Sequence, residues 1–100
     1  MGFEHYVAEL QQGRIVQFRP RGHSMEPRIQ SGELVQVSPD TSALAKGDVV
    51  FCKVRGQYYV HLIKAVRGDQ YLIGNNRGGT NGWVAKAAIF GRVIAIDPAR

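Results

Sequence analysis

The spacing of hydrophobic residues in this 100-residue chain is that of a helix near the start and that of strands afterwards. In residues 3–12, the side chains of Phe3, Tyr6 and Leu10 fall on one helical face, and Gly13 supplies a stop. This spacing predicts a short amphipathic helix. After Gly13, hydrophobic and polar residues alternate, which is typical of half-buried strands.

Six segments have the composition and the period of β-strands. They are rich in β-branched and aromatic residues, and turns containing Gly, Pro, Asn or Asp separate them. The clearest is a hairpin whose two strands meet across Arg55 and Gly56. Residues 74–82 contain four Gly and three Asn and are expected to form a loop. The expected strands are residues 15–19, 34–37, 48–54, 57–66, 70–73 and 89–97.

Strands that follow one another without helices between them favour an antiparallel sheet over a parallel one. A chain of 100 residues buries enough surface for one hydrophobic core but not for two. We therefore expect a single domain over residues 1–100, with a helix in residues 1–13 and a β core in residues 14–97. The predicted fold class is mainly β, a small antiparallel sheet or partial barrel.

The composition excludes several classes of protein. Apolar residues at 44% and charged residues at 21% are typical of a globular domain. Cys52 is the only cysteine, which excludes an intramolecular disulfide and a zinc site of several thiolates. The chain contains no apolar run near the roughly 20 residues that span a bilayer and no signal-peptide pattern, so we expect a soluble cytoplasmic protein. The net charge of +5 permits contact with nucleic acid without indicating it.

Three candidate sites match their motifs poorly. Residues 74–79 look like a phosphate-binding loop but lack its Gly-Lys-Ser/Thr ending and a following helix. The spacing of His5, His23 and His61 is not that of metal ligands, so we expect no metal and no other cofactor. Basic residues near aromatic ones such as Trp83 could bind a single-stranded nucleic acid, but most small β domains meet so loose a requirement.

A fourth candidate is a serine in a loop that contains glycine and proline. Ser24 lies between Gly22 and Pro27, and His61 lies in a predicted strand. A serine hydroxyl is a poor nucleophile until a base removes its proton, and histidine is the natural base at neutral pH. Taken alone, the pair is also compatible with a turn serine and a packed histidine.

The surroundings of Ser24 resemble those of the signal peptidase and LexA-like serine peptidase superfamily. The motifs follow the order of that family with compatible gaps and cover about residues 14–97. They are Gly22-x-Ser24-Met25-x-Pro27; Gly32-Glu33, where the family usually has Gly-Asp; Gly47-Asp48-Val49-Val50; Tyr59-Val60-His61 leading to Gly68-Asp69; Gly74-Asn75-Asn76-Arg77; and Gly91-Arg92-Val93. The resemblance implies the fold of that superfamily and a serine endopeptidase with Ser24 as its nucleophile.

The resemblance also implies where the base and its partner lie. Where bacterial members have a lysine base, this chain has His61, which is similar to the Ser-His arrangement of archaeal and endoplasmic-reticulum signal peptidases; Lys64 is the second choice. Where the family has an aspartate that assists the base, this chain has Asn75. An amide can orient an imidazole but cannot stabilise an imidazolium by charge, so we expect weakened activity. Asp69 or Asn81 could serve as the third member instead.

The oxyanion and the substrate are expected to lie beside the same loop. By resemblance, the backbone N–H of Ser24 and a second donor before it, from His23, would bind the oxyanion. Met25 and Pro27 are expected to present Ser24 at the edge of the loop and to contact substrate. The substrate is expected to bind as an added extended strand.

The expected function is cleavage of a protein or peptide in trans by a stand-alone domain. The chain has no membrane segment and only a short stretch before Ser24, where LexA-like repressors carry a DNA-binding domain. The Ala-Gly and Cys-Gly bonds that such repressors cleave in themselves do not occur in this sequence. The alternative is a peptidase-fold module with weak or no activity that binds a protein partner or nucleic acid.

Overall fold

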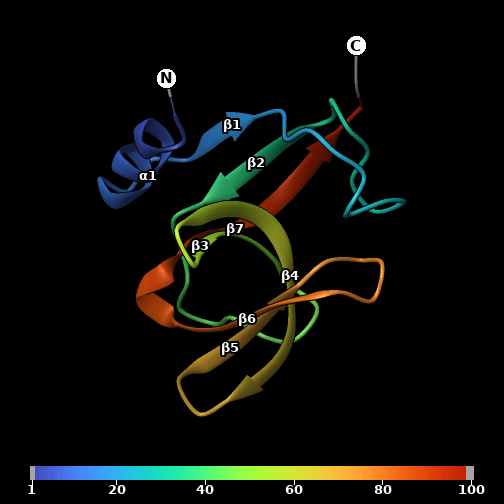
Figure 1. The fold of residues 1–100 in the computed structure, drawn as a ribbon. Helices are drawn as coiled ribbons and strands as arrows, with labels where there is room; N and C mark the ends of the chain where they lie inside the picture. The colour runs from blue at the N-terminus through green and yellow to red at the C-terminus, as the bar shows by residue number, and fades with distance from the viewer. Residues whose placement is uncertain (1, 99–100) are drawn as a thin grey trace.

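The structure, a computed structural model, describes residues 2–98 of the chain. Within that range the chain forms one α-helix, one short 3-10 helix and seven strands, arranged as Figure 1 shows. None of the helices in this range has the length and the apolar character needed to cross a membrane. In chain order the elements are α1 (Glu4–Gln11), β1 (Val16–Phe18), β2 (Leu34–Ser38), β3 (Val49–Val54), β4 (Gln57–Arg67), β5 (Gln70–Gly74), β6 (Thr80–Ala85), η1 (Lys86–Ala88) and β7 (Ile89–Asp97).

All seven strands belong to one sheet, in the spatial order β1-β2-β7-β3-β4-β5-β6, and each neighbouring pair is antiparallel. The sheet curls strongly. In Figure 1, β1, β2 and β7 run together across the upper part, and β4 arcs from there down to β5 and β6. Residues 19–22, which follow β1, and residues 58–61 in the first half of β4 line one cleft.

The central strand β3 is covered on both faces. Val49 and Phe51 belong to a hydrophobic cluster that also contains Leu10 of α1, here named the α1 cluster. Val50 and Cys52 belong to a second cluster that packs on the other side of the sheet. Successive side chains of a strand point to opposite faces, so the apolar run of β3 supplies both clusters at once.

The structure confirms the mainly β class, the helix near the start and the hairpin across Arg55 and Gly56. The six predicted strands are present, and each of their ends lies within one residue of the predicted one. These segments have clear alternation or β-branched composition, so their own sequences and the sheet favour the same conformation.

The predicted loop over residues 74–82 is wrong in its second half. Only residues 75–79 form a loop, and β6 begins at Thr80 and pairs with β5. The stretch around Asn81 and Gly82 has low strand propensity, so the pairing with β5 determines its conformation. Gly82 has a φ of +138°, a backbone conformation that other residues rarely adopt.

Candidate active site

The candidate nucleophile lies in the long loop between β1 and β2. Its neighbours Met25 and Ile29 are only 4% and 3% exposed and pack into the α1 cluster. Burial of each of these side chains contributes roughly 1.5–3 kcal/mol and fixes the loop against the sheet. The N–H of Gly22 donates to Ser31 Oγ (3.1 Å), which joins the two ends of the loop. Ser24 is thereby held half-buried in the wall of a cleft.

A second loop, residues 75–79 between β5 and β6, holds in place the loop between β1 and β2 that contains Ser24, here named the nucleophile loop. The backbone N–H of Asn76 donates to the carbonyl oxygen of Ser24 (2.9 Å). The side-chain amide of Asn76 donates to the carbonyl oxygen of Glu26 (3.2 Å). The two loops lie side by side at the right of Figure 1. Asn76 therefore fixes the backbone on both sides of Met25, close to the nucleophile.

His61 on β4 carries a side chain that is only 6% exposed, the only buried polar or charged one in residues 2–98. Its Nε2 lies 3.0 Å from Ser24 Oγ, a hydrogen-bond distance. Burial lowers the pKa of the imidazole below the ordinary 6.5, and the hydrogen bond with Asn81 opposes this effect. The ring is therefore neutral at neutral pH and can accept a proton. The ring of Tyr59 packs against it, with 4.7 Å between the centroids.

Asn81 holds the other nitrogen of the ring. His61 Nδ1 lies 2.7 Å from Asn81 Oδ1. Because a carbonyl oxygen only accepts, Nδ1 carries the hydrogen, and Nε2 is left to accept from Ser24. Asn81 is the extra residue of a β-bulge, since β6 pairs with β5 through Thr80 and Gly82 but not through Asn81. A bulge redirects a side chain, and this one brings the amide to the imidazole.

Three other residues considered as the base or its partner lie elsewhere. The ammonium group of Lys64 donates to the carbonyl oxygen of Asn75 (2.9 Å). The side-chain oxygen of Asn75 accepts from two backbone N–H groups of its own loop (2.9 and 2.8 Å), so it shapes that loop. Asp69 is exposed in the turn between β4 and β5, at the opposite end of that hairpin from His61. The hydrogen-bonded group is Ser24, His61 and Asn81.

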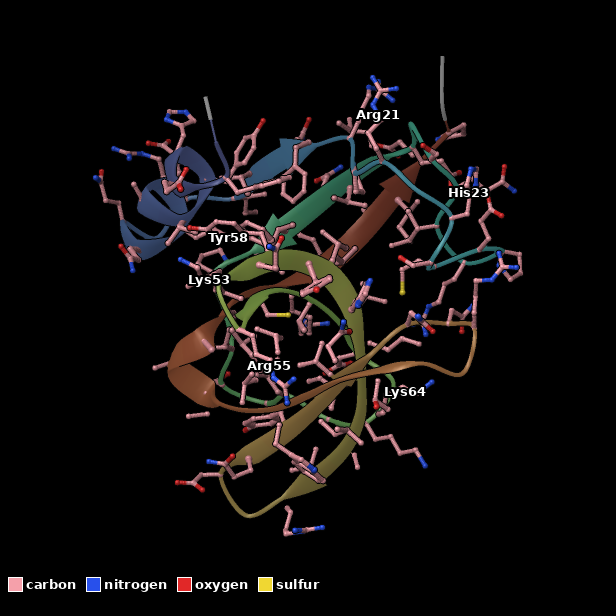
Figure 2. The ribbon with its side chains drawn as sticks, in the orientation of Figure 1. Arg21, His23, Lys53, Arg55, Tyr58 and Lys64 are labelled. Carbon is pink, nitrogen blue, oxygen red and sulfur yellow. The ribbon has the colours of Figure 1, made fainter. Side chains whose placement is uncertain are left out.

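The backbone beside Ser24 offers free hydrogen-bond donors. Within residues 2–98, the N–H groups of His23 and Ser24 donate no hydrogen bond. The imidazole of His23, on the outer side of the loop in Figure 2, lies 2.6 Å from the Glu26 carboxylate. Unpaired N–H groups next to a nucleophile are the kind of donors from which an oxyanion hole is built.

Ser24 and His61 open onto a cleft of about 630 Å³, a volume in the range of small-ligand sites. Residues 19–22 and residues 58–61 are among those that line it. Met25 also lines the cleft, whereas Pro27 is exposed and does not. In the part of the chain that the structure describes, there is no group of three His, Cys, Asp or Glu side chains that could hold a metal ion.

Two residues at the site were given no role from the sequence. Asn76 belongs to the motif that contains Asn75, but only the structure shows which amide of the pair contacts the nucleophile loop. Tyr59 lies two positions before His61 on β4, and this spacing places both side chains on one face of a strand. That period could have indicated the contact between the rings.

The family model described as Peptidase S24-like matches residues 5–94, a range that includes Ser24, His61 and Asn81. No curated protein matches the chain.

Proposed function

The chain belongs to the Peptidase S24-like family, and from this premise we propose that it is a serine endopeptidase that cleaves a protein or peptide substrate in trans. The observation that carries the proposal is the hydrogen-bonded series from Ser24 Oγ to His61 Nε2 and from His61 Nδ1 to Asn81 Oδ1, at 3.0 and 2.7 Å. A nucleophile, a base and a group that orients the base are what covalent catalysis by serine needs.

In the first half of the reaction, Ser24 Oγ attacks the carbonyl carbon of the scissile bond and its proton moves to His61 Nε2. The negative charge that develops on the substrate oxygen is bound by the N–H groups of Ser24 and His23, each worth about 3 kcal/mol if correctly aimed. The protonated imidazole then gives its proton to the leaving amine, and an ester to Ser24 remains. In the second half, His61 removes a proton from water, which attacks the ester; as the bond to Ser24 Oγ breaks, His61 returns the proton to that oxygen, and the product acid is released.

The cleft supports binding of the substrate as an extended strand. Residues 58–61 of β4 form one of its sides. These residues pair with β3, whereas pairing between β4 and β5 begins only at Leu62. One edge of this half of β4 is therefore free within residues 2–98, and an extended peptide can pair with such an edge.

A fluorophosphonate probe tests the proposal without knowledge of the substrate. Attack by Ser24 Oγ on phosphorus releases fluoride and passes the serine proton to His61, so the wild-type protein becomes labelled. We expect Ser24→Ala and His61→Ala to abolish both labelling and the cleavage of a peptide library, with thermal unfolding curves that remain cooperative. Ser42→Ala, in an exposed turn, is the matched control and keeps both activities. Full activity in either site variant contradicts the assignment.

The alternative, a module that binds a partner or nucleic acid without chemistry, has one observation in its favour. The group that orients His61 is a neutral amide, and it cannot stabilise the imidazolium by charge. Absence of labelling and of cleavage, together with a salt-dependent affinity for nucleic acid, would assign this function instead.

A further inference from the structure

Aromatic side chains form part of the lining of the cleft. Phe3, Phe51 and Tyr58 all line it. The ring centroid of Phe3 lies 5.5 Å from that of Tyr58 and 5.8 Å from that of Phe51. Phe3 is nevertheless 39% exposed, so part of this apolar ring remains accessible. We name these three residues the aromatic end.

The aromatic end is part of the same cleft as the catalytic group. Figure 2 shows Tyr58 at the left, near the start of β4, and His23, the neighbour of the nucleophile, at the right. Tyr58 precedes His61 by three residues on one strand, which corresponds to about 10 Å at roughly 3.3 Å per residue. An extended peptide that lies along β4 with its scissile bond at Ser24 therefore places a side chain about three residues away at the aromatic end.

The other cleft residues fit an apolar occupant. Ile29 and Val60 continue the apolar surface between the aromatic end and Met25. The charged residues that line the cleft are Arg19 and Arg21, and no carboxylate of residues 2–98 does. The guanidinium group of Arg19 already donates to the carbonyl oxygen of Gly32 (2.7 Å). Binding of a side chain at the aromatic end is therefore stabilised mainly by the burial of hydrocarbon.

We propose that the aromatic end is a specificity subsite that takes a large apolar side chain, such as Phe, Leu or Met, about three residues from the scissile bond of the substrate. The inference rests on the proposed function for the location of that bond. A Phe side chain that leaves water at this site strengthens binding by about tenfold or more relative to Ala. Phe3 and Tyr58 are thus specificity-determining residues.

The test uses ten-residue peptides of alanine and serine, blocked at both ends, in which a single Phe moves one position at a time. Cleavage by the wild-type protein is followed by mass spectrometry. Binding of the same peptides, fluorescently labelled, to Ser24→Ala is followed by anisotropy. We expect kcat/KM and affinity to rise at least about tenfold when Phe stands two to four residues from the cleaved bond.

Variants at the aromatic end separate the subsite from general packing. Phe3→Ala is expected to remove the preference for Phe, and Phe3→Trp, which fills the space without loss of apolar volume, is expected to remove it too. Phe90→Ala is the matched control, because its ring contacts those of Phe51 and Tyr58 but does not line the cleft. This control keeps the preference for Phe.

The outcomes distinguish the two proposals. Cleavage with no preference for the position of Phe, or a preference that both Phe3 variants keep, overturns the subsite and leaves the peptidase assignment. No cleavage of any peptide, with binding that depends on Phe and on Phe3, overturns the peptidase assignment and supports the subsite. Loss of both cleavage and binding overturns both.

Discussion

At the scale of a single residue, the chemistry of the cleft depends on which nitrogen of His61 carries a hydrogen. Asn81 Oδ1 can only accept, so it selects the tautomer in which Nε2 faces Ser24 with a free electron pair. An aspartate in its place would select the same tautomer and would also attract the positive charge that forms on the ring in the proposed reaction. The amide therefore provides orientation without charge stabilisation.

This difference predicts opposite effects of two substitutions at Asn81. Asn81→Asp is expected to raise the pKa of His61, because a carboxylate stabilises the imidazolium, to move the acidic limb of the pH profile of kcat/KM to higher pH, and to increase kcat. Asn81→Ala is expected to lower kcat by about tenfold or more, because the ring loses its orientation. Steady-state kinetics between pH 5 and pH 9 measure both effects.

Asn75→Asp is the matched control for the charge. An aspartate there can still accept the two backbone hydrogen bonds of its loop, but it does not contact the imidazole. If Asn75→Asp moves the pH profile as far as Asn81→Asp does, the third member of the group has been assigned to the wrong asparagine.

The lowered pKa of His61 also predicts how stability depends on pH. Burial lowers the pKa in the folded protein, whereas the unfolded chain has the ordinary value near 6.5. Between these two values the unfolded chain binds more protons, so the free energy of unfolding decreases as the pH falls below about 6.5. Urea titrations from pH 7.5 to pH 5 are expected to show this loss, and His61→Gln is expected to reduce it. His5→Gln, on the exposed side of α1, serves as the control and keeps the wild-type slope.

At the scale of elements, the site depends on irregularities in two strands. β4 pairs with β5 through Ile63 and Ala65 but not through Lys64, and β6 has its own bulge at Asn81. The first bulge lets the lysine reach the carbonyl oxygen of Asn75, and the next residue of that loop, Asn76, holds the nucleophile loop. Lys64 therefore acts on Ser24 through the loop of residues 75–79, as a positioning residue.

Lys64→Met is accordingly expected to lower kcat several-fold with little change in KM, because Lys64 does not line the cleft. Loss of one charge-assisted hydrogen bond is worth about 1.5–3 kcal/mol, part of which is lost from stability and part from placement of the nucleophile. Lys64→Arg, which can still donate, is expected to restore most of kcat. Lys46→Met in an exposed turn controls for the change of charge. A selective rise in KM would show that the lysine contacts substrate instead.

The elements also show where inference from sequence succeeds. The hairpin of β3 and β4 combines β-branched residues with the tight turn of Arg55 and Gly56, so local preference and tertiary pairing agree. β6 has Asn81 and Gly82 in its first half, and only its partner β5 makes it a strand. Bulges leave no periodic signal, which is why the sequence left Asn81 as one of three possible partners of the base.

At the scale of the whole molecule, Cys52 reports on the integrity of the sheet. It is fully buried on the central strand β3, and burial raises the pKa of its thiol to about 12. We expect iodoacetamide at pH 8 to alkylate the folded protein at least about a hundredfold more slowly than the urea-unfolded protein. In the folded protein the Cys52 thiol is neither ionised nor accessible to the reagent. Mass spectrometry over time measures both rates, and fast alkylation of the folded protein would show that the second cluster opens locally.

The order of the strands in the sheet is the feature that the sequence did not predict. Alternation identifies strands and their buried faces, but the order β1-β2-β7-β3-β4-β5-β6 comes from pairings between distant segments. The approach of Ser24 to His61 was expected only from resemblance to a family, since spacing along a chain does not show that two side chains meet. The sequence did not predict the aromatic end either, because Phe3 at the start of α1 and Tyr58 on β4 come together only in the folded molecule.

The bulge at Asn81 has a second consequence, which concerns solubility. β6 is the last strand of the sheet, and a regular edge strand offers unpaired N–H and C=O groups to any other molecule with a similar edge. An extra residue together with the positive φ of Gly82 breaks the regular spacing of those groups. The irregularity that brings an amide to the imidazole thus also opposes edge-to-edge aggregation, so a substitution that straightens β6 would be expected to affect both turnover and the concentration at which the protein stays dispersed.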